Sequence, residues 1–437
     1  MQQHQKTPIG PTKASWLHIL WDRLKEHPLA RVGPGLITGV ADDDPSGIVT
    51  YSQAGAQFGL NMLWTMPLSF PLMAAVQSMC ARIGRVTGKG LAANIKESFP
   101  PFVLYGVVFL LLLANTLNIA ADVAAMGEVG ELVTGINRHL MTLFFVLGTL
   151  GLQVLVPYHR YIVFLKWLTL SLLSYAAVLF TVHVPWGEVL WHTLWPRFIP
   201  DSTAAAVIVG IFGTTISPYL FFWQASEEVE DMQRDKATAL VQDPAAAAPE
   251  IRRINWDTWS GMFYSNITAY FVILTTAVTL NVVGITDINT AAQAATVLRP
   301  LAGDFAFLLF TLGIIGVGLI GVPVLAGSAG YAAAEAMGWN EGLERSASDA
   351  RGFYGVISVS VLLGLLIQYS PISPMKALFW SAVVNGIIAV PLMVVIIVMV
   401  SKKALMGAFT ADRVTLALGW IATLVMGIAT IRMFLPD

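Results

Sequence analysis

The chain has 437 residues, of which 56% are hydrophobic and only 12% are charged. Soluble globular domains carry about 25% charged residues, so this composition excludes a soluble fold and indicates an integral membrane protein. The formal net charge of -2 provides no basic surface for a nucleic-acid partner. The single cysteine, Cys80, excludes an internal disulfide framework. The expected surroundings are therefore a lipid bilayer, with no nucleic acid among the partners.

Apolar runs of ~20 residues, the length that crosses a bilayer, recur along the chain and predict an all-α polytopic membrane protein. Eleven helices are expected, approximately over residues 33–58, 60–82, 102–127, 139–156, 161–184, 202–230, 258–283, 302–336, 353–369, 375–400 and 413–434. Residues 1–32 lack an apolar core followed by a small-residue cleavage site, so they are expected to form a retained cytoplasmic tail. The polar stretch at about 231–257 is expected to be a flexible cytoplasmic loop that could contain one short surface helix.

The basic residues predict the orientation, because short cytoplasmic loops carry an excess of Lys and Arg. With the N-terminus inside, only five of the 25 basic residues fall outside, namely Arg138, Arg197, Arg299, Lys376 and Arg432. The N-terminus is therefore expected in the cytoplasm and the C-terminus outside. The absence of a cleavable signal favours a bacterial inner (plasma) membrane.

Two of the predicted spans are interrupted by proline. Pro45 follows three acidic residues in "ADDDPSGIVTY", and Pro218 interrupts "GTTISPYLFF". Proline removes a helical hydrogen bond, and non-helical backbone at membrane depth is tolerated only where protein buries it or where it lines a cavity. The breaks lie five helices apart, so the two spans run in opposite directions. This pattern predicts an inverted repeat with the substrate site at the two breaks.

The repeats are expected to comprise residues 33–184 (helices 1 to 5) and 202–400 (helices 6 to 10), followed by an eleventh helix over 413–434. A single proline kink in a membrane helix is more often structural than functional. Two breaks at matching positions, one of which carries carboxylates, favour a transport site. Asp44 at the first break has no Lys or Arg within either broken span, and an unpaired carboxylate at membrane depth indicates a functional site.

These motifs resemble those of the Nramp divalent-metal transporters. The segment "GPGLITGVADDDPSG" is similar to the first-helix motif of that family, usually Asp-Pro-Gly-Asn, and "GTTISPY" is similar to the sixth-helix motif, usually Met-Pro-His. The resemblance extends over nearly the whole chain. It implies a LeuT-like fold with a 5+5 inverted repeat, an eleventh helix, and unwound first and sixth helices.

The chain departs from this family pattern at several positions. Asp44 and Pro45 coincide with the Asp and Pro of the family, but Gly47 stands at its Asn position, Ser217 at its Met position and Tyr219 at its His position. In the third span Asp122 is kept, whereas Ala125 replaces the Glu of Asp-x-x-Glu. The combination is most similar to the Nramp-related magnesium transporters.

The resemblance implies a metal site formed by the Asp44 carboxylate, the backbone oxygens of Gly47 and Thr214, and the Ser217 hydroxyl. Thioether ligands favour soft or borderline metals, so an all-oxygen set without the family's Met favours a hard ion. Mg²⁺ dehydrates reluctantly and keeps several waters, which suits a roomier site. The substrate is therefore expected to be Mg²⁺, with Mn²⁺ also accepted.

Other polar residues are candidates for the pathway or its vestibules, namely Asp43, Asp122, Tyr219, Glu227, Glu230 and Asn385. Asp42 and Asp43 are candidates for a supporting shell or for the outer vestibule. Glu227, Glu230 and Asp231 share a helix face, and two interpretations stay open for them. They either concentrate cations at the inner mouth or form a solvated helix end balanced by Arg234 and Lys236. Asn115 and Asn118 are interpreted more readily as hydrogen bonds between helices.

The predicted function is import of a divalent cation. The resemblance implies a proton route through the positions of Tyr219 and Ala125, and neither residue titrates near neutral pH, so weak or absent proton coupling is expected. The alternative is a proton-coupled Mn²⁺/Fe²⁺ transporter of the main Nramp type. A sensor and an amino-acid or sodium symporter are weaker alternatives. No His-Glu-x-x-His motif or paired nucleophile is present, so no enzyme is expected. Neither a cofactor nor an obligate protein partner is expected.

Overall fold

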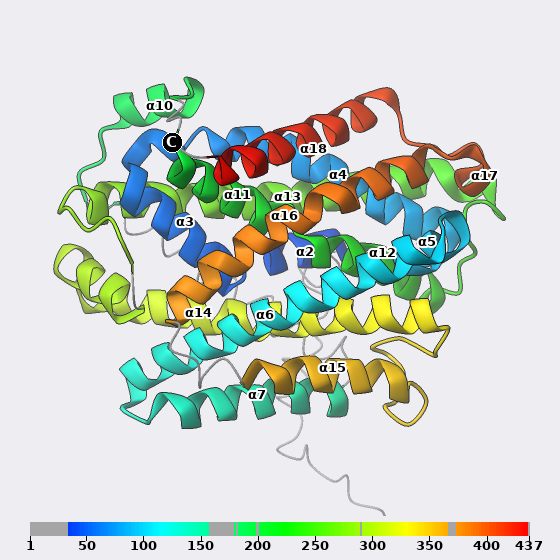
Figure 1. Ribbon diagram of the computed structural model, residues 1–437, viewed down its shortest axis with the longest axis horizontal. Helices are drawn as coiled ribbons and strands as arrows, with labels where there is room; N and C mark the ends of the chain where they lie inside the picture. Colours follow the sequence, from blue (N-terminus) through cyan, green and yellow to red (C-terminus); the bar gives the residue numbers. More distant parts are fainter. Residues whose placement is uncertain are drawn as a thin grey trace, which may run out of the picture.

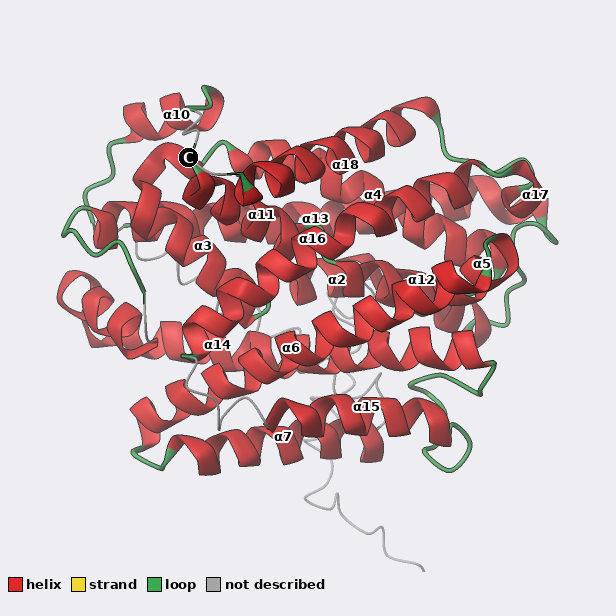
Figure 2. Cartoon of the chain, viewed as in Figure 1, coloured by secondary structure: helices red, strands yellow, loops and turns green. Residues whose placement is uncertain are grey.

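A computed structural model describes residues 34–156, 179–180, 182–197, 201–288, 291–365 and 373–435. Helices joined by loops make up the whole of these ranges, without a β-strand (Figure 2). The predicted all-α class is therefore confirmed. The expected cytoplasmic tail over residues 1–32 and most of the expected fifth helix over 161–184 lie outside the described residues.

Eighteen helical elements have defined bounds in the described residues, and sixteen of them are given first in chain order. They are α2 (Pro34–Asp42), α3 (Pro45–Phe58), η2 (Gly59–Met62), α4 (Thr65–Thr87), α5 (Leu91–Ser98), α6 (Pro101–Thr134), α7 (Arg138–Leu155), α10 (Trp186–Leu194), α11 (Ser202–Thr215), α12 (Pro218–Arg234), α13 (Ala247–Thr276), α14 (Ala291–Met337), α15 (Arg351–Leu363), α16 (Pro374–Ser401), α17 (Lys403–Met406) and α18 (Arg413–Phe434). Two further short segments flank α13, the 3₁₀ turn η4 (Pro244–Ala246) and the π-helical turn η5 (Ala277–Asn281).

Seven helical segments in the described ranges are long and apolar enough to cross a membrane, or eight if the pair Pro45–Met62 and Thr65–Thr87, bent by 114°, is counted as one span. Fewer spans are counted than the eleven expected helices because individual helices are too short or are not described. The halves of the first span are too short to be counted separately, and α15 has only 13 residues. The fifth expected helix is not described.

The helices run roughly along the longest axis of the molecule (Figure 1). α10 and the end of α18 lie at one end, here named the α10 end, and α5 and α17 lie at the other, named the α5 end. α6 packs along α14, and α7 and α15 lie together beyond them. The half-helices α2, α3, α11 and α12 lie in the middle, where α13, α16 and α14 contact them.

The half-helix α2 approaches α13 at backbone distance. A Cβ atom on Gly39 would lie 2.2 Å from the carbonyl oxygen of Gly261, and one on Gly35 would lie 2.6 Å from the backbone nitrogen of Thr258. Glycines four residues apart allow this kind of close packing between membrane helices. The Asp257 carboxylate also accepts a hydrogen bond of 2.6 Å from the backbone N–H of Gly35. α2 is therefore fixed on α13 without large side chains between them.

The connection expected over residues 231–257 is mostly helical. α12 continues to Arg234 and α13 begins at Ala247. Ion pairs within each helix support these polar turns, since Asp231 pairs with Arg234 at 2.6 Å and Glu250 pairs with Arg253 at 3.3 Å. Hydropathy ends a span where polar residues begin, whereas pairs at i, i+3 spacing stabilise a helix beyond that point.

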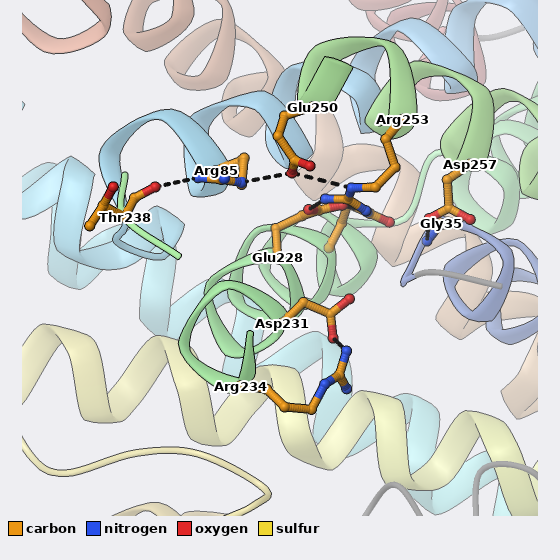
Figure 3. A network of polar contacts seen from close by, with 10 residues as sticks. Gly35, Arg85, Glu228, Asp231, Arg234, Thr238, Glu250, Arg253 and Asp257 are labelled. Atoms are coloured by element: carbon orange, nitrogen blue, oxygen red, sulfur yellow. Dashed lines mark hydrogen bonds and ion pairs between the residues drawn. The ribbon is translucent and has the colours of Figure 1, made fainter. Parts of the chain in front are cut away.

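Buried charges connect α4, α12 and α13 at the α5 end (Figure 3). Arg85 on α4 donates to Glu250 at 3.0 Å and to the Thr238 carbonyl at 2.7 Å. Arg253 on α13 contacts the same Glu250 and also donates to Glu228 on α12 at 2.6 Å. The Glu228 side chain is 0% exposed and that of Arg253 is 37% exposed. Arg253 is thus the cation that compensates a fully buried carboxylate.

Arg253→Ala should therefore destabilise the protein by about 2 kcal/mol, because it leaves Glu228 buried without a counter-charge. The loss should be smaller than for a fully buried pair, since solvent already screens part of the guanidinium. The measurement is the thermal unfolding midpoint in detergent. Arg252→Ala is the matched control, because Arg252 is exposed one residue away. If adding Glu228→Gln to the Arg253 variant recovered no stability, the proposed cause would be wrong.

A second carboxylate at this end, Glu341, lies in the loop after α14. Its Oε2 atom is buried and has no hydrogen-bond partner among the described residues. Burial raises the pKa of Glu341 from 4.5 to about 9, and repulsion from Glu335 and Glu230 adds to the effect. The folded protein therefore holds this proton at neutral pH, whereas the unfolded chain releases it.

Because the folded pKa is the higher one, Glu341 should lower stability progressively as pH rises from about 4.5 towards 9. Glu341→Gln removes this effect, so it should raise the unfolding midpoint at pH 8, on the order of 2 °C, and leave it unchanged at pH 4.5. Glu188→Gln, at an exposed carboxylate on α10, is the control. A difference between wild type and Glu341→Gln that stays constant with pH would contradict the assignment.

Candidate metal site

Both predicted breaks are present, and proline begins the second half of each span. Asp43 and Asp44 separate α2 from α3, and Ile216 and Ser217 separate α11 from α12. Pro45 and Pro218 are the first helical residues after the breaks. Proline is favoured at that position because its missing N–H would have no intrahelical partner there. The local sequence therefore explains where each helix stops and restarts.

Asp44 caps the N-terminus of α3 with its side chain. Its Oδ1 atom accepts hydrogen bonds from the Ser46 hydroxyl at 2.6 Å and the Gly47 N–H at 2.8 Å. Its Oδ2 atom accepts one from the Asn118 amide at 2.7 Å and a long one from the Tyr219 hydroxyl at 3.5 Å. The carboxylate is 1% exposed. Neutral donors therefore surround a buried anion.

The neighbouring carboxylates turn towards another helix. The Ser265 hydroxyl on α13 lies 2.7 Å from Asp42 Oδ2 and 3.2 Å from Asp43 Oδ1. Asp42 Oδ1 and Asp43 Oδ2 have no hydrogen-bond partner in the described ranges. Asp42 and Asp43 thus share a contact with α13, whereas Asp44 faces α3 and α6.

Asp122 on α6 is the fourth buried carboxylate of this region. Neither of its oxygens makes a hydrogen bond of acceptable geometry with a described residue. A Cβ atom on Gly321 of α14 would lie 2.9 Å from Asp44 Cβ and 3.9 Å from Asp122 Oδ2. Both carboxylates therefore adjoin the same glycine, and the lack of a side chain there leaves room for them.

Within the described ranges, no ion pair compensates this group of acids. The ion pairs found between described residues include none with Asp42, Asp43, Asp44 or Asp122. Buried carboxylates without counter-charges are costly, and a bound cation would offset that cost. The described part of the chain holds no group of three or more His, Cys, Asp or Glu side chains with metal-binding geometry. A cation here would therefore combine few carboxylates with neutral oxygens.

At the second break, the Ser217 hydroxyl bonds within its own span. It lies 2.7 Å from the carbonyl oxygens of both Gly213 and Thr214. The two breaks also meet, because a Cβ atom on Gly47 would lie 2.9 Å from Thr214 Oγ1. The four predicted ligand residues Asp44, Gly47, Thr214 and Ser217 thus come from two breaks that are in contact.

The remaining predicted pathway residues differ in their surroundings. The Tyr219 hydroxyl donates to the Ala41 carbonyl at 2.8 Å, which ties α12 to the end of α2. Asn385 on α16 is 1% exposed, and neither of its amide atoms has a hydrogen-bond partner in the described structure. Buried polar groups without partners are rare in proteins. Asn385 thus keeps its place as a candidate for the pathway.

The acidic face of α12 is buried at Glu227 and partly exposed at Asp231. Glu227 is 4% exposed and its Oε1 atom is buried, with no hydrogen-bond partner among the residues described. Glu230 accepts hydrogen bonds from the Tyr331 hydroxyl and from the Leu343 N–H. Arg234 pairs with Asp231 at 2.6 Å and with Asp235 at 3.7 Å. Of the two interpretations left open for Glu227, solvation is therefore excluded, and the vestibule stays a prediction.

A cavity of about 660 Å³ opens at the α10 end between α3, α11 and α16. Its lining includes Val49, Gln53, Asp287 and Lys376. Val49 lies five residues past Asp44, or about 7.5 Å along a helix. The cavity thus ends close to the site, although the Asp44 carboxylate itself is buried.

The contact between Asn118 and Asp44 is not predicted from the sequence, because an asparagine within a membrane span is interpreted more readily as a hydrogen bond between helices. Its contact with Asp44 joins residues 74 positions apart. The available signal was its position one helical turn before Asp122, on the same face of α6.

Comparison with known proteins places the chain in a family. A model of the family described as natural resistance-associated macrophage protein-like (Nramp) matches residues 35–436. A divalent metal cation transporter MntH from Acidiphilium cryptum is 25% identical over 410 residues, which cover 89% of this chain and 86% of that protein. MntH from Verminephrobacter eiseniae is 32% identical over 206 residues, 44% of each chain.

The solved structures show a shared fold. A manganese transporter from Eremococcus coleocola has a TM-score of 0.73 at 17% identity, covering 98% of this chain and 88% of that one. MhsT in complex with L-phenylalanine has a TM-score of 0.65 at 12% identity, covering 92% and 98%. The predicted LeuT-like fold is confirmed by these similarities. With its family model matched from α2 to the end of α18, the chain belongs to the Nramp family.

Proposed function

We propose that this protein transports divalent metal cations across the membrane, with Asp44 as the principal ligand. The observation that carries the proposal is the Asp44 carboxylate, which is buried at a helix break among neutral donors and forms no ion pair with a described basic residue. Relatives that align with most of the chain are named divalent metal cation transporters. A divalent cation would supply the positive charge that the fold leaves out.

The proposed ligand set adds neutral oxygens to Asp44. By resemblance, these are the carbonyls of Gly47 and Thr214 and the Ser217 hydroxyl. The Ser217 hydroxyl already bonds towards the Thr214 carbonyl, so its free lone pairs can face a cation while that hydrogen bond is kept. Water completes the shell in this proposal. Asp122 and Asn385, whose side-chain polar atoms make no hydrogen bond of acceptable geometry with the described residues, are assigned to the pathway beside the site.

Mg²⁺ is the proposed preferred substrate, with Mn²⁺ also accepted. The support is chemical, because hard oxygen ligands without a thioether suit Mg²⁺ and Mn²⁺ alike, and partial hydration favours Mg²⁺. The alternative is a proton-coupled Mn²⁺/Fe²⁺ transporter of the main Nramp type. The structurally similar protein from Eremococcus coleocola is a manganese transporter, which favours that alternative.

We further propose import without strong proton coupling, and an orientation with the α5 end in the cytoplasm. The cavity at the α10 end then serves as the outer entrance, and Glu227 and Glu230 line the inner mouth. Tyr219 is engaged with the Ala41 carbonyl, and Ala125 carries no titratable group. One charge crossing 100 mV is worth about 2.3 kcal/mol, so the membrane potential alone can drive uptake of a divalent ion.

Asp44→Asn should reduce Mg²⁺ and Mn²⁺ uptake into proteoliposomes to background, because it removes the anionic ligand while keeping the acceptor of the helix cap. Asp243→Asn, in an exposed loop, is the control. A pH-sensitive dye in the same vesicles, at clamped voltage, should report no acidification with uptake. Normal uptake by Asp44→Asn would refute the transport site, and acidification that tracks uptake would refute the uniport.

Ser217→Met should shift ion preference towards Mn²⁺ and Cd²⁺ relative to Mg²⁺, by about tenfold in competition assays, because it introduces a soft ligand. Ser217→Ala is the matched control, since it removes the hydroxyl without adding sulfur. Equal competition curves for the Met and Ala variants would show that this position does not set selectivity.

A further inference from the structure

The Asn118 side chain connects the Asp44 carboxylate with a second helix. Its Nδ2 atom lies 2.7 Å from Asp44 Oδ2, and its Oδ1 atom lies 2.6 Å from the Ser381 hydroxyl on α16. Asn118 is 0% exposed and Ser381 is 5% exposed. A carboxylate can only accept hydrogen bonds, so the amide must present its NH₂ group to Asp44. Ser381 must then donate to the amide oxygen.

The Ser381 hydroxyl has an alternative acceptor within reach. Its oxygen also lies 2.8 Å from the backbone carbonyl of Leu378, one turn earlier on α16. A hydroxyl carries one hydrogen and two lone pairs. If that hydrogen turns to Leu378, the Ser381 oxygen becomes free to accept. The amide of Asn118 can then rotate by half a turn and donate to Ser381 without losing a partner.

This rotation would point the Asn118 oxygen towards Asp44. We propose that Asn118 is a metal ligand. When a divalent cation occupies the Asp44 site, the Asn118 amide rotates, its NH₂ group donates to the Ser381 hydroxyl, and its oxygen faces the cation. The inference rests on the proposed transport of such cations. It assigns a ligand from α6, outside the two broken spans that supply the other proposed ligands.

Two properties of the site favour this assignment. In the structure Ser46, Gly47 and Asn118 point hydrogens at Asp44, so a cation that reaches Oδ2 must displace the Asn118 NH₂ group. An NH₂ group that stayed there would repel the cation, whereas the amide oxygen is a hard ligand of the kind that Mg²⁺ and Mn²⁺ bind. The neutral amide thus satisfies Asp44 in the absence of an ion and serves as a ligand in its presence.

Asn115 provides a matched control on the same helix. It is equally buried, and it donates to the Leu325 carbonyl and to Ser328 on α14, both at 2.8 Å. None of these contacts reaches Asp44. A substitution at Asn115 therefore tests what the loss of a buried amide does to the protein as a whole.

The experiment compares the variants Asn118→Leu, Asn118→Asp and Asn115→Leu with the wild type. Titration calorimetry in detergent gives the Kd for Mg²⁺ and Mn²⁺, and thermal unfolding with and without cation gives the ion-induced shift. Asn118→Leu should raise Kd at least tenfold. Asn118→Asp keeps an oxygen ligand but cannot donate, so it should keep cation binding, unfold at lower temperature without ion, and show a larger ion-induced shift. Asn115→Leu should lower stability and leave Kd within twofold.

The outcomes separate this inference from the proposed function. If wild-type protein binds neither ion, the transport proposal itself fails. If the wild type binds and Asn118→Leu has an unchanged Kd, Asn118 is not a ligand. Loss of binding in Asn118→Asp would also overturn the inference, because it would show that Asn118 acts by donating to Asp44. Should Asn118→Leu fail to fold, the Asp variant, purified with Mg²⁺ present, decides between these two roles alone.

Discussion

The unpaired Asp44 carboxylate is the constraint on which the rest of the site depends. An anion at membrane depth without a basic partner is costly, and the fold lowers that cost with hydrogen bonds alone. Ser46 and Gly47 bind one oxygen because Asp44 caps α3, and Asn118 binds the other because α6 packs beside the break. These groups are neutral, so they stabilise the carboxylate without cancelling its charge. A cation can therefore still gain from binding it.

The position of this carboxylate follows from local sequence, but its partners do not. Pro45 and Pro218 predict where the helices restart, since proline favours the first helical position. The contact between Asp44 and Asn118 depends on how α6 lies against α3, and no periodicity along either segment encodes that. The ion pair of Glu228 and Arg253 cannot be predicted from the sequence for the same reason, because its members belong to two helices separated by a polar connection.

The glycines beside Asp44 determine both which side chains are present at the two breaks and how closely the helices pack there. Gly47 stands where the motif of the similar family has Asn, and its missing Cβ lets α3 approach Thr214 Oγ1. Gly321 likewise leaves space beside Asp44 and Asp122. A side chain at either position would have to move its neighbours. The chemistry of the site and the contact between the two breaks are therefore set by the same residues.

The pairing of buried charges divides the acidic residues of the core into two groups. Glu228 and Glu250 are each matched by an arginine, and the pairs join α4, α12 and α13 into one charge network at the α5 end. Asp42, Asp43, Asp44 and Asp122 have no such match among the described residues. A positively charged side chain beside these four would stabilise the fold permanently and would compete with any arriving cation. Its absence keeps the middle of the protein electrostatically open to an ion, while the paired charges at the α5 end fix the helices around it.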